Sequence, residues 1–317
     1  MTRSYIRVPE VPPLGWPGKL SLAVAGALLG PPAGVLARWR GVPGLAWHLR
    51  AYRLALRVTA RDPGALARPL LQRLVLFPMD STRYFEFDRL WRWLAPTRFE
   101  RYLDVSSPRL FPLGLLLARP GVQADLVNPS PVDLADTGYL LERAGLGGRG
   151  RLHASTIGDA RLSAESYDVV TSISVVEHIP DDAGALRAMW RLLRPGGRLL
   201  LTVPCARVSS EQYIDRNYYG VLAPDDDGFS FWQRFYDEGL LRERLFAVAG
   251  APSRTAVYGE KMAGSLQRNL ERKRTDPGYP LWREPLMMAR GYASYPDIAD
   301  LPGEGVIALE FVKPAAA

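Results

Sequence analysis

The sequence predicts an α/β protein with a doubly wound, mostly parallel sheet, and its clearest strand-helix-strand stretches support this. Ser166 to Pro204 runs from a β-rich stretch through an amphipathic helix into a second apolar stretch. Upstream, Arg101 to Val105 and Val122 to Val127 are two further predicted strands. Because strands joined by a helix pair in parallel through a right-handed crossover, these segments are expected to form one sheet.

The elements of the first stretch follow from its residues. Tyr167 to Ile173 is bounded by turn formers, as a buried strand should be. Asp181 or Asp182 can cap the next helix, because negative charge is favourable at the positive end of the helix dipole. Pro195-Gly196-Gly197 ends that helix before the strand Arg198 to Val203. Apolar residues at helical spacing give the helix a buried face: Leu186, Met189, Trp190 and Leu193.

The same stretch resembles the second half of a class I S-adenosylmethionine-dependent methyltransferase. In that family the fourth strand ends in a VxEHI-type sequence, here Val175 to Ile179, and a PGG turn leads into the fifth. The resemblance implies a Rossmann-like fold, S-adenosylmethionine as cofactor and methyl transfer as the activity. It also implies an antiparallel last strand, near Val306 to Val312.

The cofactor half departs from the family pattern in two of three places. Ser106-Ser107-Pro108 stands where a Gly-rich turn would let the backbone approach a ligand. Asn128 stands where an acidic residue would hold the ribose, and an amide accepts weaker hydrogen bonds than a carboxylate. Gly158-Asp159-Ala160 matches the adenine-side motif. The resemblance therefore implies cofactor contacts from Asp104, Ser106, Ser107, Asn128, Asp159, Ala160 and Ser174.

These departures leave three interpretations. We favour a methyltransferase with a variant pocket over a chain that keeps the fold but has lost catalysis. A different Rossmann-like protein, such as a nicotinamide-dependent enzyme, is the third, and the sequence lacks its G-x-G-x-x-G after the first strand. Binding of the cofactor separates the first two.

Ligands of open α/β sheets bind beyond the carboxyl ends of the strands, which predicts one crevice there. Methyl transfer to O–H or N–H needs a proton acceptor, and the ordinary pKa of His178 suits that role. Glu177 would orient His178 or bind substrate; the alternative is that both residues are structural. An insertion at 205–230 supplies candidate substrate contacts: Tyr213, Arg216, Tyr218 and Tyr219.

Composition narrows the class of protein. The chain has 317 residues, 47% of them hydrophobic, and a net charge of +7, with 36 Arg against 4 Lys. A GC-rich genome explains that bias, and affinity for acidic partners is the alternative. No basic run with interleaved aromatics predicts nucleic-acid binding, and one cysteine with three scattered histidines offers no metal-ligand spacing. The single cysteine, Cys205, fits a cytoplasmic location.

The first part of the chain is expected to be a separate helical extension. Residues 1–18 are Pro-rich and expected to be irregular. Leu20 to Ala37 is uncharged but interrupted by Pro31-Pro32, and a basic amphipathic helix follows. Three expectations remain open: a membrane span by residues 20–37, peripheral contact with the inner face of a membrane through residues 20–60, and packing against the catalytic domain. The expected division is 1–80 as extension and 81–317 as catalytic domain, with insertions at 205–230 and 261–303.

Toward the carboxyl end, Phe229 to Leu245 is expected to be a helix pair before a strand near Arg254 to Tyr258. Taken together, these features predict methyl transfer to a small or medium polar acceptor. More specific forms of this prediction are an acceptor linked to a sugar and an acceptor linked to a lipid. The competing class is a non-catalytic, methyltransferase-like binding or scaffold protein. Neither the methylated atom nor the oligomeric state follows from the sequence.

Overall fold

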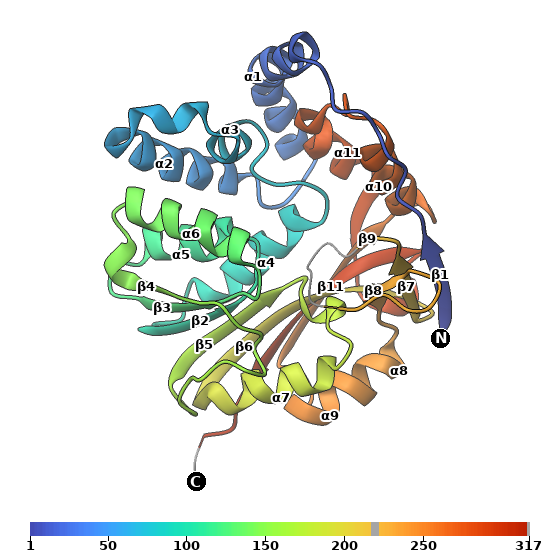
Figure 1. Cartoon of the computed structure of the whole chain (residues 1–317). Helices are drawn as coiled ribbons and strands as arrows, with labels where there is room; N and C mark the ends of the chain where they lie inside the picture. The colour runs from blue at the N-terminus through green and yellow to red at the C-terminus, as the bar shows by residue number, and fades with distance from the viewer. Residues whose placement is uncertain (217–221, 316–317) are drawn as a thin grey trace.

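A computed structural model describes residues 1–216 and 222–315, and its centre is an eight-stranded sheet with helices on both faces (Figure 1). Five neighbouring strands run parallel, and the last strand of the chain is antiparallel to both of its neighbours. The predicted doubly wound, mostly parallel sheet is therefore confirmed. From one edge to the other its strands are β10 (Tyr292–Tyr295), β9 (Arg254–Glu260), β11 (Glu304–Val312), β6 (Leu193–Ala206), β5 (Tyr167–Ile173), β2 (Arg101–Val105), β3 (Gln123–Val127) and β4 (Gly150–His153).

Helices cover both faces of this sheet because each has an apolar stripe to bury. Each face has its own cluster of buried residues, so the sheet separates two cores. Asp181 accepts a hydrogen bond from the Gly184 N–H and caps α7, while Ser130 caps α6. One face carries α4 (Arg83–Leu94), α5 (Leu110–Ala118) and α6 (Pro131–Arg143), and the other α7 (Asp182–Leu192), α8 (Glu238–Leu241) and α9 (Ala247–Ala249) (Figure 1).

A further helical layer lies over α5 and α6, formed by α2 (Ala46–Arg61) and α3 (Pro69–Leu76) (Figure 1). Trp47 anchors it: the side chain is 2% exposed, and its ring lies 5.0 Å from that of Phe87 and 5.2 Å from that of Phe111. The predicted apolar face of this segment is thus buried against the helices of the sheet. Its arginines face outward, except that Arg50 stacks on Trp91.

Helix α1 (Trp16–Trp39) passes through Pro31 and Pro32 without ending, so the expected break there is wrong. The two prolines remove the hydrogen bonds to the carbonyls of Ala27 and Leu28. Both of those residues are exposed, so water can hydrogen-bond their carbonyl groups. The helix packs on α11 (Glu284–Gly291), which follows α10 (Ser265–Thr275).

A second, three-stranded sheet joins distant parts of the chain: β1 (Thr2–Ile6), β7 (Ser210–Ile214) and β8 (Ser230–Phe235). It corrects two expectations, since Thr2–Ile6 is not irregular and Ser230–Phe235 is not helical. The β8 sequence is rich in aromatic residues, which are enriched in strands, and its pairing with β7 makes this segment a strand and not a helix. β1 pairs in parallel with β7, and Tyr5 stacks on Tyr213 across this pair.

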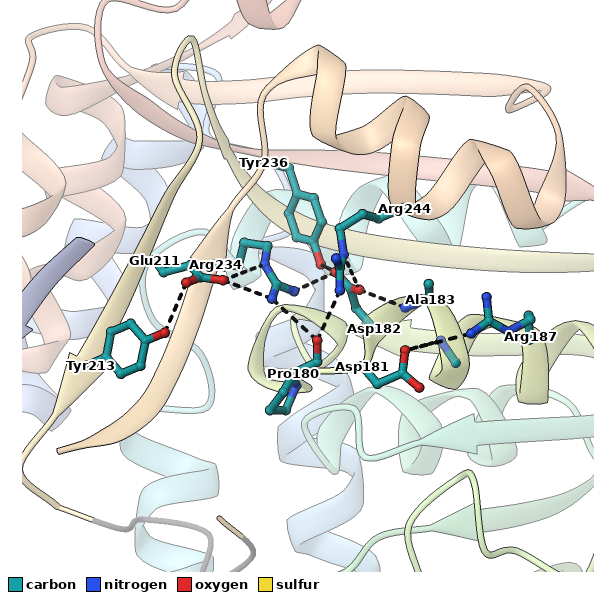
Figure 2. A network of polar contacts seen from close by, with 11 residues as sticks. Pro180, Asp181, Asp182, Ala183, Arg187, Glu211, Tyr213, Arg234, Tyr236 and Arg244 are labelled. Carbon is teal, nitrogen blue, oxygen red and sulfur yellow. Dashed lines mark hydrogen bonds and ion pairs between the residues drawn. The ribbon is translucent and has the colours of Figure 1, made fainter. Parts of the chain in front are cut away.

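Figure 2 shows the buried ionic network that attaches this small sheet to the start of α7. Asp182, fully buried, accepts hydrogen bonds from Arg234, Tyr236 and Arg244, each over 2.6 Å. Arg234 also bonds Glu211 on β7 over 3.1 Å. Because each charge has several partners, the network fixes the small sheet against the end of β5.

Replacing Arg234 by Ala should lower the free energy of unfolding by about 3–5 kcal/mol, because it leaves two buried carboxylates without their shared cation. Urea denaturation followed by circular dichroism measures this. The matched control is Arg187→Ala, whose exposed pair with Asp181 should contribute less than about 0.5 kcal/mol. Equal effects of the two substitutions would show that the network does not stabilise the fold.

Candidate functional site

A cavity of about 760 Å³ lies at the carboxyl ends of β2, β3 and β5. Its lining comes from those strand ends, from the starts of α5 and α6, and from α3. The lining includes five of the seven predicted cofactor residues, namely Asp104, Ser106, Ser107, Asn128 and Ser174. Asp159 and Ala160 are not in it: Asp159 is exposed and hydrogen-bonded to Thr156, and Ala160 is buried in the core beside it.

Asp104 holds the loop after β2 in shape. One carboxylate oxygen accepts the N–H of Ser107 over 3.1 Å, and the other accepts the hydroxyls of Tyr102 and Thr171. Burial raises the pKa of Asp104 to about 6, against these stabilising hydrogen bonds. The carboxylate of Asp104 therefore holds the loop through the Ser107 N–H and places negative charge in the cavity lining.

Ser106 shows how the loop turns without glycine. Its φ is 53°, in the left-handed region that glycine normally occupies, and its hydroxyl donates to the Val127 carbonyl over 3.1 Å. Ser174, at the end of β5, is also left-handed with φ of 47°. A non-glycine residue in this region is strained, and both strained residues line the cavity.

Asn128 uses part of its hydrogen-bonding capacity within its own turn. Its side-chain oxygen accepts the N–H of Ser130 over 2.8 Å, in a turn that starts α6. The oxygen keeps a second lone pair and the NH₂ group has two N–H donors, so the amide can both accept and donate further hydrogen bonds. The residue still lines the cavity beside Ser106.

Glu86 is a site residue that the sequence analysis missed. It lies on α4, is fully buried, and accepts hydrogen bonds from the hydroxyls of Ser174 and Thr202. Its other oxygen pairs with Arg83 over 2.6 Å, and Arg83 lines the cavity. The only signal in the sequence is a carboxylate between Phe85 and Phe87 on an otherwise apolar helix face. On the same helix, Tyr84 and Phe85 are buried in the core.

Glu177 follows β5 and lies close to Ser174 and Arg83. Its side chain is 2% exposed, and Oε2 is buried with no hydrogen-bond partner among the described residues. Burial raises the pKa of Glu177 to about 8; Glu86 adds to this effect, and Arg83 and Ser174 oppose it. A carboxyl group with such a pKa can accept a proton near neutral pH.

His178 follows Glu177, is partly buried with 15% of its side chain exposed, and does not line the cavity. Its Nδ1 is hydrogen-bonded to the carbonyl of Trp232, which fixes the ring, and Nε2 lies 3.8 Å from Glu177 Oε1. Burial lowers the pKa of His178 to about 4, so the ring is neutral at pH 7. The ordinary histidine pKa used in the sequence analysis therefore does not apply.

Of the predicted substrate residues, the two that the structure describes do not line the cavity. Tyr213 is in the small sheet, where its hydroxyl donates to Glu211 over 3.1 Å, and Arg216 is exposed. Tyr218 and Tyr219 lie outside the described residues.

The cavity lining also carries charges that the sequence analysis did not select. Arg109 pairs with Asp133 over 2.5 Å and with Asp136 over 2.9 Å. Arg68 and Arg73 contribute positive charge from the α3 side. None of these residues belongs to a motif, so only the three-dimensional arrangement reveals them.

Comparison with known families matches a methyltransferase domain model to residues 88–248. Among curated proteins, the ubiquinone biosynthesis O-methyltransferase of Methylocella silvestris is 29% identical over 190 residues, covering 58% of this chain and 72% of that protein. The protein of the same name from Aeromonas salmonicida is 46% identical over 43 residues, covering 14% of this chain and 18% of that protein. With this and several other relatives, the chain spans less than half of the relative's length.

Among solved structures, geranyl diphosphate methyltransferase in complex with SAM aligns with a TM-score of 0.48 at 12% identity, covering 80% of this chain and 95% of that chain. A putative sarcosine dimethylglycine methyltransferase from Galdieria sulphuraria aligns with a TM-score of 0.44 at 17% identity, covering 71% and 86%. The family match at 88–248 contains the polar strand ends of the cavity, whereas α3 lies outside it.

The raised pKa of Glu177 predicts a pH dependence of stability. The folded state binds the proton of Glu177 more tightly than the unfolded chain does. Protonation of Glu177 therefore stabilises the fold at acidic pH, and this stabilisation is lost as pH rises from about 4.5 to about 8. Relative to Glu177→Gln, the wild-type free energy of unfolding should fall by at least about 2 kcal/mol across this range. Urea denaturation at several pH values measures this, with the exposed Glu243→Gln as control. Parallel curves for wild type and Glu177→Gln would contradict it.

Proposed function

The chain belongs to the class I S-adenosylmethionine-dependent methyltransferases, whose domain model it matches over residues 88–248, and we propose that it methylates a hydroxyl oxygen of a small-molecule acceptor. The resemblance seen in the sequence, with S-adenosylmethionine as cofactor, is confirmed by that match. The observation that carries the proposal is the cavity at the strand ends together with the buried, unpartnered Oε2 of Glu177. Glu177 is not itself in the cavity lining, but it lies close to Ser174 and Arg83, which are. The relatives' name, O-methyltransferase, supports oxygen as the methylated atom.

The polar part of the cavity fits the cofactor. Asp104, Asp133 and Asp136 bring negative charge that suits a sulfonium cation, and Asn128 offers amide N–H groups for hydroxyl oxygens. Ser106 and Ser107 stand where the family's glycine turn would lie, and Ser174 lines the cavity next to Ile173, whose N–H donates to the Ser107 hydroxyl over 3.0 Å. These residues would hold S-adenosylmethionine, which supplies an electrophilic methyl group on sulfur.

The remaining requirement is removal of the acceptor's proton. Among the buried groups next to the cavity, Glu177 has the raised pKa and the unpartnered oxygen that suit this task. A phenol has a pKa near 10, so proton transfer to a base of pKa about 8 is close to balanced, whereas an aliphatic alcohol is far more basic once ionised. The proposal is therefore a phenolic hydroxyl, with Glu177 as base and His178 as a positioning residue.

We also propose that the protein lies on the inner face of a membrane through α1. By length and composition this helix could cross a membrane, but Gly26, Ala33 and Ala37 pack it against the protein on one side. Its other side exposes large apolar groups between basic flanks, including Trp16 at 73%, Leu28 at 69% and Trp39 at 82% exposure. Such a helix suits the interface of an anionic bilayer.

The state of the cysteine bears on the location of the protein, and helix α1 bears on the type of acceptor. The single cysteine is buried and unpaired, which fits a reducing cytoplasm. Of the two linked acceptors expected from the sequence, a lipid-linked molecule is the one that an apolar membrane-facing helix supports. No comparable feature favours a sugar-linked acceptor.

Calorimetric titration of the full chain with S-adenosylhomocysteine tests the function, and micromolar binding is expected. Glu177→Gln should keep that binding within about threefold while lowering kcat toward a phenolic acceptor by about 10²–10⁴-fold. The wild-type kcat should rise with pH up to about 8, because Glu177 must be ionised to accept the proton. A folded protein that binds no S-adenosylhomocysteine at millimolar concentration would favour the non-catalytic alternative.

Membrane contact is tested by co-sedimentation with vesicles of phosphatidylcholine and phosphatidylglycerol. The wild-type chain should pellet with the vesicles, and Leu28→Glu with Trp39→Glu should reduce the bound fraction at least tenfold, since charge is disfavoured at the interface. Val132→Glu is the control, because Val132 is 73% exposed on α6, away from α1. Equal binding by all three proteins would contradict the assignment to α1.

A further inference from the structure

The cavity has two chemically distinct parts, and the second is not explained by the cofactor. We propose that this second part binds a linear hydrocarbon chain of the acceptor, so that the acceptor is an amphiphile with a hydroxyl-bearing head. The inference rests on the proposed function, because it concerns the same cavity. It adds a tail-binding site formed mainly by α3, α5 and α6.

The site is formed by the apolar side chains that α3, α5 and α6 and their ends contribute to the cavity lining. Most of these side chains are almost fully buried, with Leu140 at 0%, Leu110 at 4% and Leu74 at 7% exposure. They belong to one hydrophobic core, in which α2 packs on each of the three helices, so the wall is pre-formed. We define the apolar wall as Leu70, Leu74, Phe77, Leu110, Leu134 and Leu140.

Several polar groups near the apolar wall already have partners, and Arg68 lies over the Tyr139 ring, 4.3 Å from its centroid, while Arg73 adds a charged group to the lining from α3. Thr137 donates its hydroxyl to the Asp133 carbonyl over 2.7 Å, which leaves its methyl group for the cavity. Arg109 is paired with both Asp133 and Asp136. Water is held in protein cavities by two or more polar partners, and cavities lined by Leu and Phe instead stay dry and take up hydrocarbon. A sugar would leave its hydroxyls unpaired here.

The position of the wall indicates where such a chain comes from. Phe77, at the end of α3, packs against Gly26 of α1 as well as lining the cavity. The apolar wall is therefore one side chain away from the helix whose exposed face is proposed to contact the membrane. Its α3 residues lie outside the matched family domain at 88–248.

The test uses two catechols as probes, 4-methylcatechol and 4-pentylcatechol, titrated calorimetrically into the full chain with and without S-adenosylhomocysteine. Each methylene that becomes buried contributes about a fourfold gain in affinity, so the pentyl probe should bind at least tenfold more tightly. Leu70→Trp and Leu74→Trp place an indole in the tail site and should reduce this preference below threefold. Leu70 is only partly buried, so its variant can fold even if Leu74→Trp does not.

The matched control is Leu66→Trp, a residue 53% exposed in the neighbouring turn and absent from the cavity lining, which should keep the wild-type preference. A wild-type preference below threefold would overturn the tail site, as would a preference that survives in a folded Leu70→Trp variant. The proposed function has a separate readout: loss of S-adenosylhomocysteine binding would count against it, while the preference between probes is still measured without cofactor.

Discussion

The carboxylate of Glu86 is the interaction on which the geometry of the site depends. It is buried on α4, yet it collects the hydroxyls of Ser174 and Thr202 at the ends of β5 and β6 and the guanidinium of Arg83. A buried carboxylate is tolerated only when it is hydrogen-bonded and paired, and here two of its three partners, Ser174 and Arg83, line the cavity. The helix and the strand ends are thereby held in one arrangement, with Ser174 kept in its strained conformation.

The neighbouring carboxyl group shows the opposite condition. Glu177 is as buried as Glu86 but has an oxygen with no partner among the described residues, and its pKa rises accordingly. Two carboxyl groups close to the same serine, Ser174, thus differ in role because their surroundings differ: one organises structure and the other keeps the capacity to take a proton. The neutral His178 is held by the Trp232 carbonyl, and its Nε2 lies 3.8 Å from Oε1 of Glu177.

The sheet could be predicted from the sequence because its strands and helices are specified locally. Tyr167 to Ile173 and the Asp181 cap are short-range patterns, and both are found in the structure. The role of Glu86 could not be predicted, since its partners at Ser174 and Thr202 are distant in sequence. The same holds for β8, whose aromatic residues suit either a helix or a strand until β7 pairs with them. Local patterns also did not predict that the Asn128 side-chain oxygen would accept the N–H of Ser130.

The parallel pairing of β1 with β7 affects the order of folding while the chain is being synthesised. Thr2 pairs with Ser210, so the first strand to emerge during synthesis must wait for a partner made much later. At typical elongation rates that interval is on the order of 10–40 s. Throughout it, the first strand is an unpaired edge, open to chaperones and to neighbouring chains. The small sheet is therefore expected to close last, after the large sheet has formed.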